Sequence, residues 1–299
     1  MRLHLETTNR CTLKCPACPR TVWNKILGMP VETRDLDYTL LYKFLDCDSG
    51  QQVTELLLCG DYGDTLYYPK LLDFIKDFRQ YEFIIATNGS YKKQSWWEEL
   101  ARLLTPEDIV RFAVDGIGQE QNEKYRINCD WNSMVVGIDT LREYNIKLEC
   151  ETLNFKFNVD DLDKIESWAI SKGMTWTGKK THRFGNDEII PSDNYVLTRE
   201  LYNDDFALNT PIDITPRCDS AKVITSENYF LPCDWIRNPL TYFKSNLYND
   251  KKWLDRLDIA RFNLDDCLIV LEEWKQEVIE NGKKGTCDVL CKMKCRTYD

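Results

Sequence analysis

The sequence predicts an α/β protein whose first two-thirds form a parallel sheet. Short apolar runs rich in branched side chains alternate with amphipathic helical runs up to about residue 180. This alternation is typical of parallel strands joined by right-handed helical crossovers. A polar, proline-containing stretch then leads into a shorter part without the alternation. We therefore expect one large domain over residues 1–210 and a small α+β domain over residues 211–299.

The individual elements follow from the spacing of apolar residues. Strands are expected where four or more apolar or β-branched residues are clustered, at 2–7, 53–59, 82–87, 109–114, 146–153 and 174–178. Helices are expected where apolar residues recur at helical spacing, at 38–46, 70–78, 96–104, 134–144 and 162–171. Six strand–helix units are too few to close an eight-stranded barrel.

Composition limits the function classes. The 299 residues are 43% hydrophobic, which is enough for a sizeable core. The net charge of −10 argues against a duplex nucleic-acid partner, because such binders need a basic face. No apolar run approaches the ~20 residues of a membrane span. The N-terminal residues lack the hydrophobic core of a signal peptide, so we expect a cytoplasmic protein without membrane association.

The most informative motif is a cysteine triad directly after the first predicted strand. Cys11, Cys15 and Cys18 have the spacing C-x3-C-x2-C, and no fourth ligand follows nearby. A four-iron cluster usually takes four cysteines, so three leave one iron open to bind a substrate or cofactor. A zinc site is the main alternative, although zinc motifs usually supply four ligands. A disulfide framework fits poorly, because the cysteine count of 13 is odd.

The segment from Leu5 to Arg20, LETTNRCTLKCPACPR, resembles the opening of the radical S-adenosylmethionine (SAM) enzymes. The resemblance implies that the open iron of a [4Fe-4S] cluster binds the amino and carboxylate groups of SAM. An electron from the cluster then splits the sulfonium, and the 5′-deoxyadenosyl radical abstracts hydrogen from a substrate. The family fold is a partial (β/α)6 TIM-like barrel. Cys11, Cys15 and Cys18 would be its catalytic metal ligands, at the carboxyl edge of the sheet.

Further segments carry the same resemblance over residues 1–185. The run CGDYGDTLYYP after the second strand is similar to the family's Gly-Gly-Glu-Pro region, with Asp64 in place of the glutamate. The resemblance implies that four residues of this run bind SAM: Gly60, Asp61, Gly63 and Asp64. Glycine lets the backbone approach a ligand closely.

Three later strand ends add to this pattern. TNG at 87–89 resembles the family's T-N-G segment, and FAVDG at 112–116 resembles its F-S-(I/V)-D-G segment. The continuation EKYR at 123–126 and the run FKFN at 155–158 are also similar to the family. The resemblance makes Asn88 and Asp115 polar neighbours of the bound cofactor.

A second cysteine set lies in the C-terminal part. Cys218 and Cys233 flank a predicted hairpin with its turn at 226–228, and the pattern resembles the start of the twitch and SPASM auxiliary-cluster domains. The remaining cysteines of the set are Cys287, Cys291 and Cys295. The seven-cysteine SPASM pattern is absent, so the resemblance implies one auxiliary [4Fe-4S] cluster held by Cys218, Cys233 and two of the other three. A zinc knuckle with the same ligands is the alternative.

The other ionisable residues give weaker indications. Cys267 lies on an apolar helical run and is expected in the core, and four further cysteines are interpreted as structural: Cys47, Cys59, Cys129 and Cys150. Only two histidines are present, which gives histidine acid–base catalysis little support. A basic group follows the sixth strand and either anchors a carboxylate or phosphate or forms a solvated patch: Lys179, Lys180, His182 and Arg183.

These patterns lead to one functional hypothesis. The protein is interpreted as a radical SAM oxidoreductase or maturase, which requires an external one-electron reductant of the flavodoxin or ferredoxin type. Its auxiliary cluster would accept an electron, as in a dehydrogenase, or bind the substrate. No separate peptide-binding domain precedes residue 11, which favours a small-molecule substrate or a peptide delivered by another protein. The alternatives are a non-catalytic iron–sulfur redox protein and a zinc-stabilised binding protein.

Overall fold

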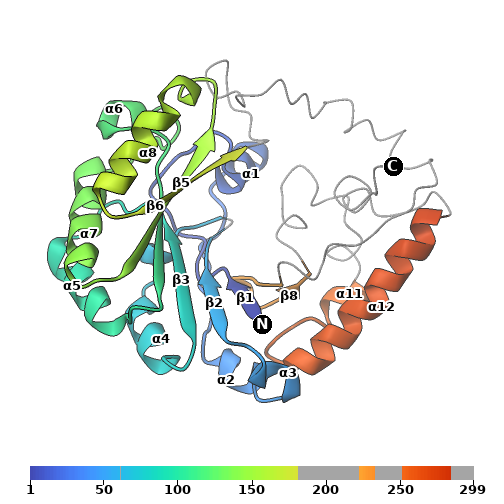
Figure 1. Cartoon of the computed structure of the whole chain (residues 1–299). Coiled ribbons are helices and arrows are strands. Elements are labelled where there is room, and N and C mark those ends of the chain that lie inside the picture. Colours follow the sequence, from blue (N-terminus) through green and yellow to red (C-terminus); the bar gives the residue numbers. More distant parts are fainter. Residues whose placement is uncertain (61, 181–221, 233–250, 284–299) are drawn as a thin grey trace. The chain divides into compact units, whose positions relative to one another are not determined.

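The computed structural model describes residues 1–60, 62–180, 222–232 and 251–283 (Figure 1). The chain divides into two compact units. The large unit comprises residues 6–35 and 55–195, and the small unit comprises residues 1–5, 36–54 and 196–299. The predicted domain boundary near residue 210 lies outside the described residues.

The large unit contains a parallel sheet whose strands are neighbours in chain order. Its strands are β2 (Glu55–Leu58), β3 (Glu82–Thr87), β4 (Ile109–Ala113), β5 (Lys147–Asn154) and β6 (Thr175–Lys180). The register pairs Leu58 with Ile85, Thr87 with Phe112, and Ala113 with Glu151. Because all five strands are parallel, the segments that follow them meet at one edge of the sheet.

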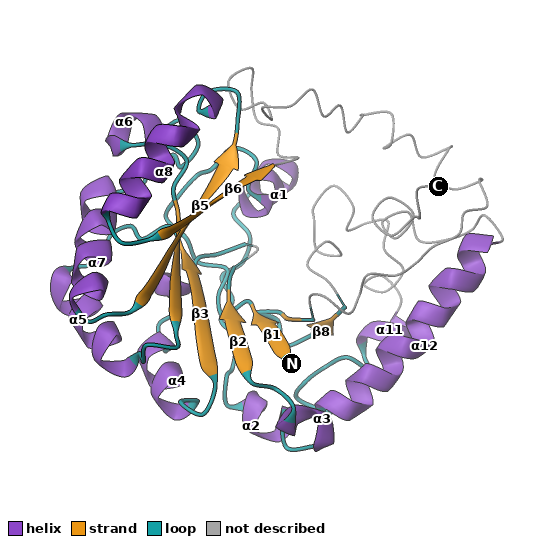
Figure 2. Ribbon diagram, viewed as in Figure 1, coloured by secondary structure: helices purple, strands orange, loops and turns teal. Residues whose placement is uncertain are grey.

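Helices cover one side of these strands (Figure 2). They are α4 (Leu71–Asp77), α5 (Gln94–Leu103), α7 (Trp131–Glu143) and α8 (Leu162–Ser171). Trp97 of α5 is fully buried and packs on Phe112 of β4, with ring centroids 5.8 Å apart. Phe74 of α4 meets Phe83 of β3 edge-on at 5.9 Å. Alternate residues of each strand therefore face the helices, as strand geometry requires.

Shorter elements lie at the carboxyl edge of the sheet. They are α1 (Pro19–Leu27), the 3-10 helix η1 (Thr65–Tyr67), α6 (Gly118–Glu123) and the 3-10 helix η2 (Val159–Asp161). Helix α1 starts at a proline and stops at Gly28, whose φ of 66° is a left-handed value that suits glycine. Helix α7 is capped by Asp130, whose carboxylate accepts a hydrogen bond from the Ser133 amide at 3.0 Å.

The small unit contains the first strand of the chain and the hairpin. Strand β1 (Arg2–Leu5) pairs in parallel with β7 (Val223–Ile224), and β7 pairs antiparallel with β8 (Phe230–Leu231). The predicted turn at 226–228 is confirmed, and Asn228 adopts a left-handed φ of 66°.

Helices complete the small unit. They are α2 (Leu40–Phe44), α3 (Asp48–Gln51), α11 (Lys251–Leu254) and α12 (Leu264–Lys283). Phe44 packs on Phe230 with ring centroids 5.5 Å apart, and Trp253 and Trp274 are buried. Cys267 is fully buried on α12, which confirms its predicted place in the core.

The expected α/β class, with strands alternating with helices, is confirmed, and the sheet formed by the described strands does not close into a barrel. The predicted bounds of β3 and α8 agree with the structure, and the ends of the other predicted strands and helices in the large unit and of β1 and α2 differ by at most three residues. Helices α1, α3 and α6 were not predicted, because α3 and α6 are short and polar and α1 begins inside the cysteine motif. Among the helices of the described residues, none combines the length and apolar character of a membrane span.

The contact between α5 and α7 depends on Gly137. A Cβ atom on Gly137 would stand 2.4 Å from Cε2 of the buried Trp97 ring. We expect Gly137→Ala to lower the free energy of unfolding by about 1–3 kcal/mol, because overpacking outweighs the gain in helix propensity. Urea denaturation measures the change. Val136→Ala, at a 39% exposed position one residue earlier, is the matched control; equal stability of the two variants would contradict this packing.

Candidate functional site

The cysteine triad lies in a loop that is fixed by backbone contacts. The Lys14 amide donates to the Ile127 carbonyl at 2.9 Å, and the side-chain amide of Asn128 donates to the Thr12 carbonyl at 2.9 Å. The Arg20 guanidinium donates to the Leu13 carbonyl. The turn between α6 and α7 therefore holds the triad loop in place.

The three cysteines share one packed cluster of side chains. Its buried members are Leu13, Cys15, Tyr125, Cys129 and Phe155, and its half-buried members are Cys11, Ala17, Cys18, Leu153 and Phe157. The Cys15 thiol is thus buried among aromatic and aliphatic groups, and Cys11 and Cys18 are half-buried beside them. An apolar environment of this kind strengthens electrostatic interactions within it.

Burial changes the acidity of the first cysteine. Loss of solvent raises the pKa of the Cys11 thiol to about 12, and the charge of Asp64 adds to the effect. Cys11 is therefore protonated at neutral pH without a metal. Metal binding must displace this proton, because the thiolate is the ligand.

The donor set of the loop fits an iron–sulfur cluster. Among the described residues, no three cysteine, histidine or acidic side chains lie close enough to share one metal ion. In a four-iron cluster each thiolate binds a different iron, so the ligands stand farther apart than around a single ion. Three soft thiols on one loop, packed in an apolar setting, suit such a cluster.

The turn after β2 packs tightly on the segment that leads into the triad. A Cβ on Gly60 would stand 2.4 Å from the Gly63 carbonyl oxygen, and a Cβ on Gly63 would stand 2.1 Å from the Thr8 carbonyl oxygen. The Asp64 amide also donates to the Arg10 carbonyl at 2.8 Å. Glycine is required at both positions because no side chain fits. Asp61, also expected at the cofactor, lies outside the described residues.

The Asp64 carboxylate is fully engaged inside the protein. It is buried and accepts hydrogen bonds from the Leu66 amide at 3.0 Å and the Thr87 hydroxyl at 2.9 Å. It also accepts from Asn88, through its backbone amide at 2.6 Å and its side-chain amide at 2.5 Å. Burial raises the pKa of Asp64, and these donors oppose the change. Asp64 therefore positions the end of β3.

Asn88 connects this carboxylate to the triad. Its side-chain nitrogen, which is held by Asp64, lies 3.7 Å from the Cys11 sulfur. Its side-chain oxygen accepts a bond from the Ser90 amide at 3.0 Å. The structure thus brings together three predicted site residues: Cys11, Asp64 and Asn88.

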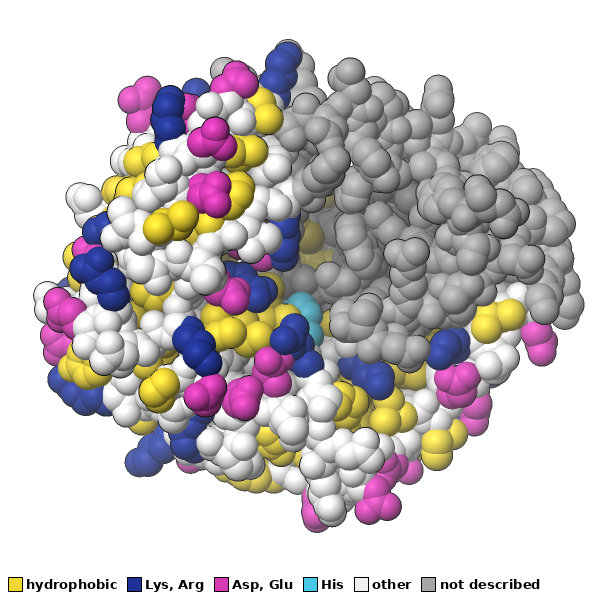
Figure 3. All heavy atoms as spheres, viewed as in Figure 1, with side chains coloured by type: hydrophobic (Ala, Val, Ile, Leu, Met, Phe, Trp, Pro, Cys, Tyr) yellow, Lys and Arg dark blue, Asp and Glu magenta, His cyan; other side chains and the backbone are white. Residues whose placement is uncertain are grey.

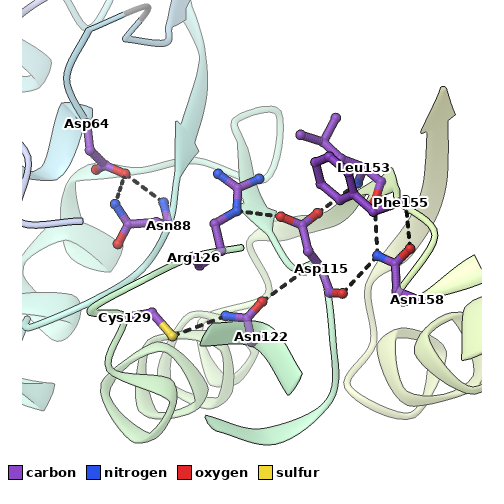
Figure 4. A network of polar contacts seen from close by, with 9 residues as sticks. All are labelled: Asp64, Asn88, Asp115, Asn122, Arg126, Cys129, Leu153, Phe155 and Asn158. Carbon is purple, nitrogen blue, oxygen red and sulfur yellow. Dashed lines mark hydrogen bonds and ion pairs between the residues drawn. The ribbon is translucent and has the colours of Figure 1, made fainter. Parts of the chain in front are cut away.

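A buried ion pair lies next to this group (Figure 4). The Asp115 carboxylate is fully buried and accepts from Arg126 Nε at 2.6 Å and from the Leu153 amide at 2.8 Å. The Asp115 amide donates to Asn122, and its carbonyl accepts from the Asn158 side chain, both at 2.9 Å. Asp115 therefore joins the ends of β4 and β5 to α6.

The sequence did not predict a separate role for Arg126. Burial is the largest single influence and works against its charge, but nearby negative groups, of which Asp115 is the first, together raise the pKa of Arg126. Its charge also acts on Asp64. Within the described part of the chain, only its Nε has a hydrogen-bond partner. The two terminal nitrogens remain able to donate to an anion, and the EKYR segment was the signal that pointed here.

The remaining predicted residues give a mixed result. Lys179 lies on β6 and forms an ion pair with Glu151 of β5 at 2.5 Å, so a neighbouring carboxylate already binds it. Lys180 ends the same strand. The other candidates lie outside the described residues: His182, Arg183, Cys218, Cys233, Cys287, Cys291 and Cys295.

The sequence and the fold were compared with those of known proteins. No protein-family model matches the chain. A Pyrococcus furiosus protein, described as a tungsten-containing aldehyde ferredoxin oxidoreductase cofactor-modifying protein, is 30% identical over 263 residues. The match covers 81% of this chain and 63% of that protein, so the chain spans less than two thirds of the relative's length.

Two solved structures share the fold. anSMEcpe with bound AdoMet is 15% identical, with a TM-score of 0.60 over 98% of this chain and 89% of that one. Streptococcus suis SuiB is also 15% identical, with a TM-score of 0.52 over 86% of this chain and 66% of that one. Both are radical SAM enzymes. The chain therefore has the partial-barrel fold of these two enzymes, which confirms the predicted fold.

The acidity of Cys11 leads to a test on the metal-free protein. At pH 8 a thiol with a pKa near 12 has almost no thiolate. We expect iodoacetamide to alkylate Cys11 on the order of 100-fold more slowly in folded protein than in guanidinium. The folded-state rate should climb steadily as pH rises toward 12. Peptide mass spectrometry measures the rate, and equal rates in both solvents would contradict a protonated, partly shielded thiol.

Proposed function

We propose that this protein is a radical SAM enzyme that cleaves SAM reductively and starts hydrogen abstraction from a substrate. The observation that carries the proposal is the packing of Cys11, Cys15 and Cys18 in one apolar cluster at the carboxyl edge of the sheet. A polar layer, which includes Asn88 and Arg126, adjoins the cluster. The relative and the solved structures support the same class.

In this proposal the triad thiols hold a [4Fe-4S] cluster. When bound, the cluster supplies the electron and an open iron for SAM. The chain's own residues shape the site around it. Asn88 directs an N–H group at the Cys11 sulfur. Hydrogen bonds to cluster sulfurs tune the reduction potential, so Asn88 and its partner Asp64 would influence how readily the cluster is reduced.

Arg126 and the glycine turn would bind the two ends of the SAM amino acid. The terminal nitrogens of Arg126 are suited to a carboxylate, because a buried guanidinium binds such anions with charge-assisted hydrogen bonds. The backbone carbonyls of Gly60 and Gly63 are suited to the amino group, since the Asp64 carboxylate already accepts several hydrogen bonds. This assignment revises the expected direct role of Asp64 to one of positioning.

Aromatic groups would keep water from the reacting atoms. Tyr125 and Phe155 are fully buried, with ring centroids 4.5 Å apart, and Phe157 stacks on Phe155 at 5.6 Å. Exclusion of water protects reactive intermediates from side reactions. A carbon radical is such an intermediate, and the packed rings favour this use.

We further propose that Cys218, Cys233 and two of Cys287, Cys291 and Cys295 hold an auxiliary [4Fe-4S] cluster. The β7–β8 hairpin between the first two supports the resemblance to twitch and SPASM domains. The cluster would take an electron from the substrate radical or bind the substrate. The relative's name favours a small cofactor-type substrate, and the SuiB structure with precursor peptide SuiA favours a peptide. A cytoplasmic oxidoreductase or maturase is consistent with both.

The first functional test addresses SAM cleavage. Reconstituted protein with dithionite should form 5′-deoxyadenosine from SAM, as measured by chromatography. Replacing Cys11, Cys15 and Cys18 together by Ala should abolish the product, because no thiolate remains to hold the cluster. Cys150→Ala, at a buried cysteine on β5, is the control for loss of a thiol. Undiminished product from the triple variant would show that the triad is not the SAM site.

The second functional test addresses the C-terminal cysteines. Cys218→Ala/Cys233→Ala should still cleave SAM, because the triad is intact, and should contain about half of the ~8 irons of a two-cluster chain. Turnover of the true substrate should be lost, since the substrate radical then has no acceptor for its electron. Circular dichroism controls for unfolding after loss of a metal. Stoichiometric zinc without iron in the C-terminal site would instead favour a zinc knuckle.

A further inference from the structure

One arginine reaches from the start of α1 back to the triad loop. Arg20 lies two residues after Cys18, the residue that precedes α1, and its guanidinium donates to the Leu13 carbonyl in the middle of the loop. The Cys18 amide donates in turn to the Cys15 carbonyl at 3.1 Å. The Arg20 side chain is half-buried. It therefore lies against the loop that carries the three thiols.

The guanidinium of Arg20 is only partly satisfied. Among the described residues, six buried side-chain nitrogen or oxygen atoms have no hydrogen-bond partner, and Nε of Arg20 is the only one that belongs to a charged group. A buried N–H of a charged group without an acceptor is costly, so an acceptor is expected beside this atom.

Other arginines near the triad are neutralised by carboxylates. Arg10, one residue before the triad, pairs with Asp35 at 2.9 Å. Arg126 pairs with Asp115 at 2.6 Å. Arg20 forms no ion pair with any carboxylate of the described part of the chain. Its positive charge is therefore left for another anion.

The charge of Arg20 acts on the triad. Burial and the charge of Asp64 raise the pKa of the Cys11 thiol, and the charge of Arg20 is the largest influence that lowers it. Basic and acidic side chains are interspersed on the face shown in Figure 3, and water and salt screen such surface charges. A half-buried guanidinium is screened much less.

We propose that Arg20 is the charge partner of the cluster held by the triad and makes this cluster easier to reduce. The proposal rests on the proposed function, because it needs a cluster on Cys11, Cys15 and Cys18. Three thiolates make the bound cluster anionic, and an anion supplies the acceptor that Nε of Arg20 lacks. Reduction adds one electron to the cluster, and no bond forms or breaks. The reduced form therefore gains more from a nearby positive charge.

Two other uses of Arg20 would have different consequences. A purely structural role would depend on the hydrogen bond to the Leu13 carbonyl and not on the charge. A role in binding the carboxylate of SAM would be seen only when SAM is present. The reduction potential of the cluster before SAM is added therefore separates the proposed role from both.

The experiment is a redox titration of the reconstituted full-length protein, followed by electron paramagnetic resonance. The signal that changes when SAM is added identifies the triad cluster. Arg20→Gln keeps a donor for the Leu13 carbonyl but removes the charge. At a fixed potential it should lower the ratio of reduced to oxidised triad cluster about tenfold, which equals about 59 mV for a one-electron couple. Arg20→Lys keeps the charge and should stay within about threefold of the wild-type ratio.

Lys14→Gln is the matched control. It removes the same charge from an exposed position inside the ligand loop. It should change the ratio less than about twofold, because water and salt screen an exposed charge. The iron content of each variant is measured in parallel. The titration reports only clusters that are present, so incomplete loading does not alter the midpoint.

The outcomes separate the alternatives. A wild-type potential in Arg20→Gln would overturn the proposal, and so would an equal change in Arg20→Lys or in Lys14→Gln, because the charge of Arg20 would then not be the cause. An unchanged potential with weaker SAM binding would assign Arg20 to SAM instead.

Iron content decides the case in which a variant does not load. Loss of the triad iron from both Arg20 variants would make Arg20 a structural residue and overturn the proposal. Loss from Arg20→Gln alone would support it, because only that variant lacks the charge. If no signal of the wild type responds to SAM, the proposed function itself fails, and this proposal fails with it.

Discussion

The buried pair of Asp115 and Arg126 is the contact on which the candidate site depends. Asp115 accepts from Arg126 and from the Leu153 amide, and its backbone bonds to Asn122 and Asn158. These bonds join β4 and β5 to α6, and the turn after α6 holds the triad loop. Removing one partner of a buried ion pair costs about 3–5 kcal/mol, so a change here would affect every segment at this edge of the sheet.

A second series of contacts brings the strand ends to the first triad cysteine. Asp64 follows β2, Asn88 follows β3, and Cys11 precedes both in the chain. Asp64 uses its carboxylate to hold Asn88, and Asn88 points its amide at the Cys11 sulfur. The glycines before Asp64 serve the same end, because only a residue without a side chain lets this turn approach the Thr8 backbone. The residues of the 60–64 run that resemble a SAM-binding motif thus also position Cys11.

The triad loop separates two environments within a few residues. Its cysteines pack beside aromatic rings, whereas Thr12 and Lys14 are exposed. A redox cluster in such a loop would be shielded on the side of its substrate and accessible on the side of its electron donor.

The sequence by itself determined the parallel α/β fold and the cysteine triad. Apolar periodicity is local, so the strands predicted at 82–87 and 109–114 could be located without contacts, and thiol spacing indicates a metal by chemistry alone. It did not reveal that the Asp64 carboxylate has several donors, that Asp115 binds Nε of Arg126, or that Glu151 binds Lys179. These facts depend on partners 24, 11 and 28 residues away in the chain. Only the tertiary structure decides them, because hydrogen bonds and burial follow from which strand ends meet.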